Sequence, residues 1–144
     1  MQQTCKIQFD IVSTDPAANL GFEVWLNNEK ISDSIVFDSQ HIEFQISDDD
    51  GDHQMKFVLK NKTDKHTVID QDGNILSDAT IKVQNLKFDE IELGYVLSQL
   101  AKYTHNSNGH SEQITQQFFG EMGCNGTVSL EFSTPIYLWL LENM

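Results

Sequence analysis

Oxygen-bearing side chains gather in two stretches of the sequence, where they could bind a hard cation. Residues 48–52 read DDDGD, and a second acidic stretch lies between residues 64 and 78. Calcium takes six to eight oxygen ligands from carboxylates, amides and backbone carbonyls. The second stretch is the better candidate, because a long polar loop gains order from a bound ion. Its predicted ligands are Asp64, Asp70, Asp72, Asn74 and Asp78.

The calcium hypothesis depends on oxygen density and not on a known ligand pattern. An EF-hand loop starting at Asp70 would need glycine at position 75, where the chain has Ile75, and glutamate at its twelfth position, where the chain has Ile81. Adjacent carboxylates in water repel each other by only about 1 kcal/mol at ~4 Å. A solvated acidic loop without an ion is therefore the alternative.

Catalytic patterns are missing from the sequence. There is no nucleophile elbow, phosphate-binding loop, HExxH or Cys/His metal pattern. Cys5 and Cys124 are the only cysteines, and they could pair only if the first strand lies beside a late strand. The sequence therefore predicts a protein without enzymatic activity.

The charge and hydropathy of the chain narrow its partners. The formal net charge is -13, and all nine basic residues are lysines. Affinity for phosphate backbones comes from neutralising them with Lys and Arg, so we expect no nucleic-acid partner. The longest apolar run, residues 136–141, is far shorter than the ~20 residues of a membrane span, and residues 1–12 lack a secretory apolar core. We expect no membrane partner and no export signal.

Alternating apolar and polar residues are the main structural signal. Such alternation runs through residues 42–46 and 55–59, and Gly51 lies in the acidic stretch between them. Period two is typical of strands with one buried face, and glycine beside Asp favours a turn. The pattern predicts an antiparallel β-hairpin over residues 41–62.

Similar patterns predict strands along most of the chain, near residues 4–13, 22–26, 35–37, 81–93, 114–122 and 128–133. Residues 124–127 (CNGT) suit a type I′ turn between the last two. Residues 63–83 predict a long ordered loop with short strands and a turn at Asp72-Gly73. Residues 95–104 and 136–144 fit either helix or strand. The fold predicted is one domain, residues 1–144: a mainly antiparallel β-sandwich of jelly-roll type with a possible short C-terminal helix, or else a barrel.

Two segments resemble known families. FEVWLNNEKI, together with FVLKNKTDKHTVIDQDGNILSDATIKVQNLKFDEIEL, resembles carbohydrate-binding modules of the β-sandwich type in its order of strand, hairpin, Asp-rich loop and strand pair. The tail MGCNGTVSLEFSTPIYLWLLENM is similar to the C-terminal end of virion structural proteins of marine contractile-tailed phages, the cyanophage type. Those proteins share NKTDKHTVID as well, so the resemblance covers roughly residues 20–144.

The resemblance implies a non-catalytic virion structural protein, placed in the particle as a decoration or as a tail or fibre component. Its partners would be other virion proteins or copies of itself. The apolar run IYLWLL fits assembly, with burial in the core as the alternative. The second function implied is a calcium-dependent carbohydrate-binding module that attaches to a host-surface glycan. Trp25 and Tyr103 are its predicted ligand-binding residues, because their rings could stack on a sugar. Trp25 lies on the polar face of its strand together with Glu23. Its side chain is therefore either covered by a loop or available to bind a partner.

Overall fold

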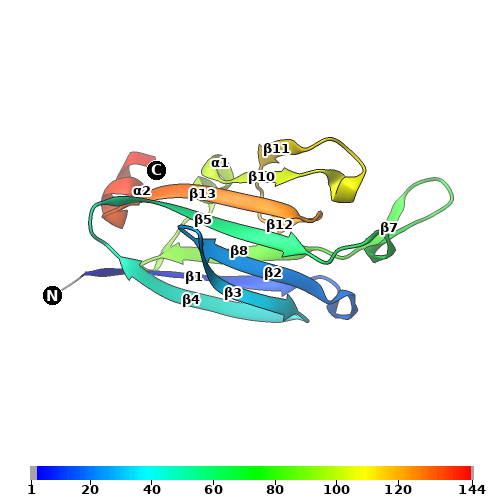
Figure 1. Cartoon of the computed structure of the whole chain (residues 1–144), viewed down its shortest axis with the longest axis horizontal. Helices are drawn as coiled ribbons and strands as arrows, with labels where there is room; N and C mark the ends of the chain where they lie inside the picture. The colour runs from blue at the N-terminus through cyan, green and yellow to red at the C-terminus, as the bar shows by residue number, and fades with distance from the viewer. Residues whose placement is uncertain (1–2, 144) are drawn as a thin grey trace.

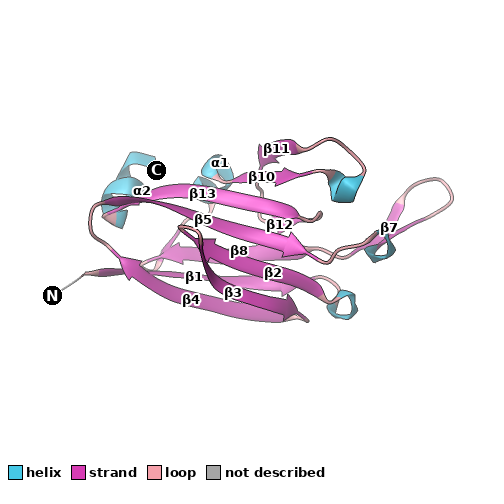
Figure 2. Cartoon of the chain, viewed as in Figure 1, coloured by secondary structure: helices cyan, strands magenta, loops and turns pink. Residues whose placement is uncertain are grey.

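The computed structural model describes residues 3–143 and is built mainly from antiparallel strands (Figures 1 and 2). Sheet A has the strand order β12-β8-β1-β4, with β9 also paired to β8. Its strands are β1 (Thr4–Ser13), β4 (Ser39–Ser47), β8 (Ile81–Phe88), β9 (Ile91–Glu92) and β12 (Glu121–Met122).

Sheet B has the order β11-β10-β13-β5-β2-β3. Its strands are β2 (Leu20–Leu26), β3 (Glu29–Val36), β5 (Gly51–Lys60), β10 (Lys102–His105), β11 (Ile114–Gln117) and β13 (Gly126–Thr134). Asn27 and Asn28, with φ of 49° and 69°, form the tight turn between β2 and β3. Positive φ at both central residues is the signature of the type I′ hairpin turn.

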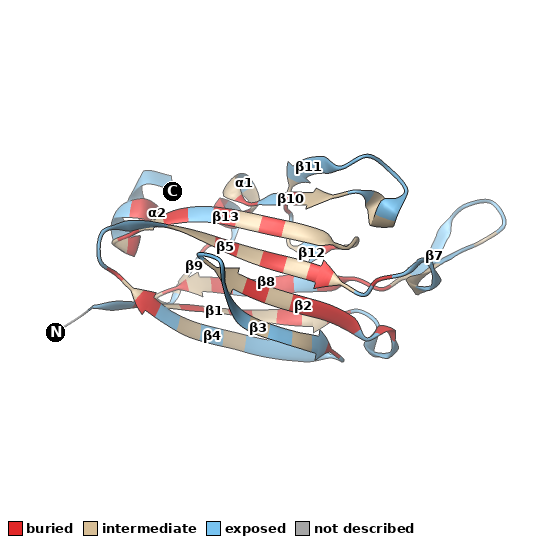
Figure 3. Ribbon diagram, in the orientation of Figure 1, coloured by how far each residue is buried: buried red, intermediate tan, exposed pale blue. Residues whose placement is uncertain are grey.

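The two sheets pack face to face around one hydrophobic core. Phe9 of sheet A lies 4.9 Å from Phe57 of sheet B, measured between ring centres, and Phe88 of sheet A lies 5.0 Å from Phe132 of sheet B. Buried and less buried residues alternate along β1, β5 and β13 (Figure 3). The predicted β-sandwich is confirmed, and the strands form separate sheets instead of a closed barrel.

The hairpin predicted over residues 41–62 is wrong, although both of its strands exist. β4 pairs with β1 in sheet A, whereas β5 pairs with β2 and β13 in sheet B. Residues 48–50 therefore carry the chain from one sheet to the other. Alternation shows that a strand buries one face, but both sheets of a sandwich have such a face, so alternation does not choose the pairing partner.

The second predicted hairpin is also wrong. Residues 114–122 divide into β11 of sheet B and β12 of sheet A, with Gly120 at φ 99° between them. Strand β13 pairs with β10 and β5 instead. Asn125 and Gly126 do not have the positive φ that a type I′ turn requires. Gly126 serves close packing, because a Cβ there would collide with the backbone of β10.

The two segments left open in the sequence become mainly helical. Residues 95–104 contain the helix α1 (Tyr95–Leu100) followed by most of β10, and the C-terminal run forms α2 (Ile136–Asn143). Helix α2 buries Ile136, Trp139 and Leu140 but exposes the outer side chains Tyr137, Leu138 and Leu141. Burial in the core, the alternative reading of IYLWLL, therefore holds for the inner side of the helix, and the role of IYLWLL in assembly stays a prediction. Within residues 3–143, no helix has the length and apolar character to cross a membrane.

A small hairpin extends beyond one end of the sandwich (Figure 1). It follows the short 3-10 helix η2 (Asp64–His66) and consists of β6 (Thr67–Ile69) and β7 (Ile75–Asp78), which pair with each other as a two-stranded sheet. This matches the predicted ordered loop with short strands. Four of its aliphatic side chains are exposed: Val68, Ile69, Ile75 and Leu76. Two further 3-10 turns, η1 (Pro16–Ala18) and η3 (Ser107–Gly109), complete the described elements.

The two cysteines are free thiols in different parts of the sandwich. Cys5 is buried in β1 of sheet A, and Cys124 precedes β13 of sheet B. The pKa of Cys5 is raised to about 12, mainly by burial of the thiol, so the thiol stays protonated at neutral pH.

Candidate ligand-binding face

Three of the four carboxylates predicted to bind calcium, those of Asp64, Asp70 and Asp78, have partners within or beside the β6–β7 hairpin. The Asp70 carboxylate accepts hydrogen bonds from the backbone N–H groups of Asp72 and Asn74, both at 2.9 Å, and so closes the turn. The hydrogen bond from the Asn74 backbone N–H is the main reason that the pKa of Asp70 is lowered. Asp64 Oδ1 instead lies 2.8 Å from His110 Nε2.

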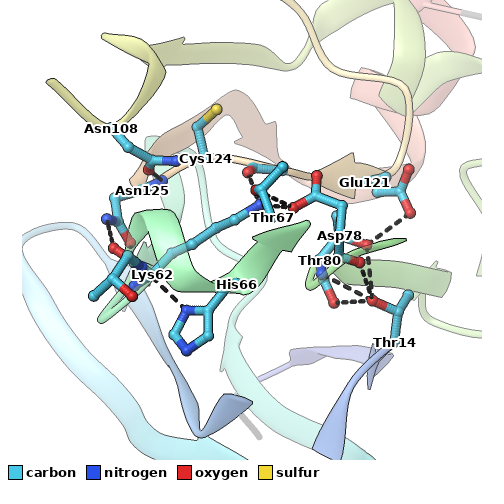
Figure 4. Close-up of polar contacts among 12 residues, drawn as sticks. Thr14, Lys62, His66, Thr67, Asp78, Thr80, Asn108, Glu121, Cys124 and Asn125 are labelled. Atoms are coloured by element: carbon cyan, nitrogen blue, oxygen red, sulfur yellow. Dashed lines mark hydrogen bonds and ion pairs between the residues drawn. The ribbon is translucent and has the colours of Figure 1, made fainter. Parts of the chain in front are cut away.

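Asp78 belongs to a polar cluster at the base of the hairpin (Figure 4). Lys62 Nζ donates to Asp78 Oδ1 at 2.6 Å and also to the carbonyl of Gly123, and Thr67 Oγ1 donates to the same Asp78 oxygen. The Lys62 side chain is only 1% exposed. Asp78 therefore neutralises a buried ammonium group, and its Oδ1 atom already accepts two hydrogen bonds.

The predicted calcium site is not assembled. Across residues 3–143, the structure has no group of three or more His, Cys, Asp or Glu side chains placed to hold a metal ion. Turn closure accounts for Asp70, the buried Lys62 accounts for Asp78, and Asp64 contacts His110, whereas Asp72 is exposed. The residues present do not fit the calcium ion that was predicted from the sequence.

Tyr103 also has a structural role that the sequence did not reveal. Its side chain lies inside the sandwich, where the residue is 4% exposed. The hydroxyl donates to the Cys124 carbonyl and accepts from the Cys124 N–H at 2.8 Å, and burial raises the pKa of Tyr103. The expectation that Tyr103 stacks on a sugar does not fit this position, because its ring packs against Phe118 and His105.

Trp25 does face outward, on the outer face of sheet B. Its strand neighbours Phe22 and Val24 point into the core. Trp25 Nε1 donates to Glu23 Oε1 at 2.8 Å, and Lys30 Nζ lies 5.7 Å from the centre of the indole ring. A hydrogen bond from Lys60, 2.7 Å from Glu23 Oε2, is the main cause of the lowered pKa of Glu23. The indole is therefore held in place by a charged glutamate.

Two hollows are lined in part by outward-facing residues of sheet B. The Trp25 hollow has a volume of about 320 Å³ and is lined by Glu23, Trp25, Asn28, Lys56, Val58 and Thr127. The Glu131 hollow has a volume of about 610 Å³ and is lined by Asn27, Asp52, His53, Gln54, Glu131, Phe132, Ser133 and Trp139. Both hollows draw residues from β5 and β13 and from the β2–β3 turn.

Strand register places four polar side chains of the Glu131 hollow on the outer face. Asp52 is opposite Ser133 and Gln54 is opposite Glu131 in the β5–β13 pair, whereas the intervening Phe132 is buried. Within residues 3–143, the side chains of these four polar residues form no hydrogen bond within 3.5 Å and no ion pair within 4.0 Å. Their oxygen and nitrogen atoms are therefore free to bind a ligand.

Other contacts fix the wall of the Glu131 hollow. Asn27 Oδ1 accepts from the backbone N–H of Gln54 at 2.9 Å, and Asn27 Nδ2 lies 2.9 Å from His53 Nδ1. His53 Nε2 lies 3.0 Å from Thr134 Oγ1, and the imidazole stacks on Phe132. Sequence reasoning missed this hollow, although the outward positions of residues 52, 54, 131 and 133 follow from the alternation alone.

Comparison with known proteins adds one distant likeness. No protein-family model and no curated protein matches the sequence. Among solved structures, the chain is similar to the selenomethionine form of vCBM60, described with two families of calcium-dependent carbohydrate-binding modules that circular permutation links. The two chains share 9% identity with a TM-score of 0.45, over 88% of this chain and 89% of the other. At this level of similarity, the fold assignment rests on the strands and core of the chain itself.

Proposed function

We propose that this chain is a non-catalytic module that binds a glycan on the outer face of sheet B. The observation that carries the proposal is an outward indole, fixed by Glu23, beside polar side chains that have no side-chain partner among residues 3–143. Sugars present apolar ring faces and many hydroxyl groups. Indole rings stack on the first, and carboxylates, amides and hydroxyls bind the second.

The dimensions of the face support the same ligand class. The Glu131 hollow, at about 610 Å³, lies within the ~300–1,000 Å³ typical of small-molecule sites. Its walls come from paired strands and a tight turn, which limits the conformational entropy lost on binding. No step of this proposal uses calcium, because Asp70 and Asp78 serve the hairpin and Lys62.

A glycan array, probed with and without calcium and with EDTA, tests the proposal. We expect binding that survives EDTA and that weakens about tenfold in Trp25→Ala, since loss of an aromatic contact of about 1.4 kcal/mol has that effect. Tyr95→Ala is the matched control, because Tyr95 is exposed and lies outside both hollows. Absence of binding to every glycan, or equal binding by Trp25→Ala, would contradict the proposal.

A role as a virion structural component is the second candidate. Two observations favour it besides the resemblance of the C-terminal segment. The β6–β7 hairpin exposes four aliphatic side chains, and α2 exposes Tyr137, Leu138 and Leu141. Grouped apolar side chains on a surface are typical of protein–protein contacts. Other virion proteins or copies of this chain would cover them, and glycan binding would then serve attachment to a host surface.

Mass spectrometry of purified phage particles tests this second candidate. We expect the chain among the particle proteins, at a copy number set by the symmetry of its location. If the chain is expressed during infection but is missing from the particles, the virion role is wrong. Glycan binding would be unaffected by that result.

A further inference from the structure

We infer that the Trp25 hollow and the Glu131 hollow are the two halves of one groove along β5, and that this groove binds an extended, non-acidic oligosaccharide. The inference rests on the proposed glycan-binding function and specifies the ligand of that same face. It follows from the strand register, the length of the lined segment and the charges on the groove.

Register shows that the two hollows adjoin. Gln54 lines the Glu131 hollow and Lys56 lines the Trp25 hollow. These are consecutive outward positions on β5, about 7 Å apart along the strand. The turn residues Asn27 and Asn28 are also adjacent, and each lines one of the two hollows. Neighbouring residues therefore line the two hollows on the strand side and on the turn side.

The lined segment is long enough for several sugar rings. It runs on β5 from Asp52, opposite Ser133, to Val58, opposite Thr127. Six residue-to-residue steps of extended chain span about 20 Å. A single ring that stacks on Trp25 cannot also contact the Asp52 end. The binding free energy is therefore expected to increase with chain length until both hollows are filled.

The charges on the groove disfavour acidic glycans. The described residues that line the groove include three carboxylates and one ammonium group. The carboxylates are those of Glu23, Asp52 and Glu131, and the ammonium group is that of Lys56. Lys60 from outside the groove balances Glu23. Asp52 and Glu131 lie on neighbouring strands as diagonal partners, about 7–8 Å apart. A uronate or sulfate group placed there would meet two like charges, and the chain as a whole has a net charge of -13.

Isothermal titration calorimetry with oligosaccharides of defined length tests the inference. The probes are cello-, xylo- and manno-oligosaccharides from disaccharide to hexasaccharide, with oligogalacturonates as the acidic series. We expect at least one neutral series to bind, with affinity rising tenfold or more from disaccharide to hexasaccharide as the second hollow is filled. Oligogalacturonates are expected to bind more weakly than that series, most clearly at low salt.

Variants separate the two halves of the groove. Trp25→Ala removes the stacking surface of one hollow, and Gln54→Ala removes a polar group of the other. Each should weaken hexasaccharide binding, whereas a disaccharide that fills one hollow should respond to only one of them. The pair Asp52→Asn and Glu131→Gln should strengthen binding of oligogalacturonate. The control pair, Glu112→Gln with Glu142→Gln, removes the same charge from exposed sites outside the groove and should not.

Three results would overturn the inference while leaving glycan binding intact. They are affinity that is independent of chain length, oligogalacturonate binding as tight as neutral binding, and equal responses of the charge pair and its control. Failure of every glycan on the array to bind would instead remove the proposed function itself. Thermal unfolding of each variant confirms that the fold is retained.

Discussion

Lys62 shows how one buried charge can organise the end of the sandwich. Its ammonium group bonds to Asp78 and to the Gly123 carbonyl, while the Asn125 side chain bonds to its backbone N–H and C=O groups at 2.9 and 2.8 Å. These contacts join the base of the β6–β7 hairpin to the turn before β13. Because buried charges are tolerated only when they are paired, removal of either Lys62 or Asp78 would leave the other without its ion-pair partner.

We expect Lys62→Met to destabilise the protein by about 2–4 kcal/mol, because Asp78 and the Gly123 carbonyl lose their charged donor. The lower end applies because water can partly replace the lysine at Asp78, whose side chain is 28% exposed. Urea unfolding measures the loss. Lys65→Met is the control, because Lys65 is exposed. Equal stability of the two variants would show that the Lys62 pair contributes nothing.

A second residue pair predicts how stability varies with pH. His41 Nδ1 lies 2.7 Å from Asp10 Oδ1 across β4 and β1, and this hydrogen bond is the main reason that the pKa of His41 is raised. A raised histidine pKa contributes stability below the ordinary value of about 6.5, and the contribution is lost as pH rises through the raised pKa. The pKa of Asp10 is lowered, first by Asn85 and then by His41, so its contribution is lost as pH falls through that lowered pKa.

We therefore expect wild-type stability to decline slightly as pH rises from about 6 to 9, and this decline to be reduced in His41→Gln. The effect is small because both side chains are partly exposed to solvent. Denaturant midpoints across that pH range provide the measurement. A decline of the same size in His41→Gln would assign the pH dependence to other groups.

Single residues of the candidate site were predictable where alternation determined their direction. Trp25 faces outward as its polar neighbour Glu23 indicated. Tyr103 was not predictable, because its segment allowed both helix and strand and its inward direction depends on pairing with Val128. The acidic residues were found correctly as a group, but their function in the turn depends on which backbone N–H groups lie within reach.

At the level of elements, the segment that joins the two sheets, residues 48–50, also caps the N-terminus of the C-terminal helix α2. Asp48, in the segment that joins β4 to β5, accepts a hydrogen bond from the backbone N–H of Ile136 at 2.8 Å. A carboxylate at a helix N-terminus accepts a hydrogen bond from a backbone N–H that has no partner within the helix. Its negative charge also interacts favourably with the positive end of the helix dipole. This contact fixes α2 against the end of the core, where Trp139 packs on Phe88 and Phe132.

Asp48→Ala should cost about 0.5–2 kcal/mol of stability, the range for loss of a helix cap. Asp48→Asn should lose less, since an amide oxygen can still accept the bond. Asp50→Ala serves as the control from the same segment, where Asp50 is exposed. Chemical unfolding compares the three variants, and a loss in Asp50→Ala equal to that in Asp48→Ala would argue against the cap.

The β6–β7 hairpin is expected to contribute to association and not to stability. Its four exposed aliphatic side chains bury little surface in this chain. Replacing Val68, Ile69, Ile75 and Leu76 by Thr or Ser should change the unfolding free energy by about 0.5 kcal/mol or less for each replacement. If the hairpin supports assembly, sedimentation velocity at rising concentration should show less self-association, or particles should incorporate less of the variant. A large loss of stability would place these side chains in the core instead.

Elements were easier to predict than their pairing. Period two located β1, β2, β4, β5 and β13 because each has one face in the core. The hairpins failed because the chain changes sheets after β4 and again between β11 and β12. That choice depends on long-range contacts between residues far apart in sequence, which no short window of the sequence contains.

For the whole molecule, the net charge predicts the response to salt and to calcium. Twenty-two carboxylates stand against nine ammonium groups, so repulsion outweighs pairs such as Lys6 with Glu90. Salt shortens the screening length from about 30 Å at 0.01 M to about 8 Å at 0.15 M. The unfolding free energy should therefore rise over this range of NaCl, with a smaller rise in a variant that combines Asp50→Asn, Glu112→Gln and Glu142→Gln.

Calcium chloride at matched ionic strength separates screening from a specific site. Because the carboxylates of Asp64, Asp70 and Asp78 are engaged in turn closure and ion pairs, calcium should stabilise the chain no more than sodium does. The melting temperature in each salt, before and after EDTA, measures the difference. An excess stabilisation by calcium that keeps rising with the logarithm of its concentration would reveal a bound ion, because a ligand that prefers the folded state stabilises it by RT ln(1 + [L]/Kd). Asp72→Asn, whose carboxylate is exposed in the turn, would then show whether that ion sits in the hairpin.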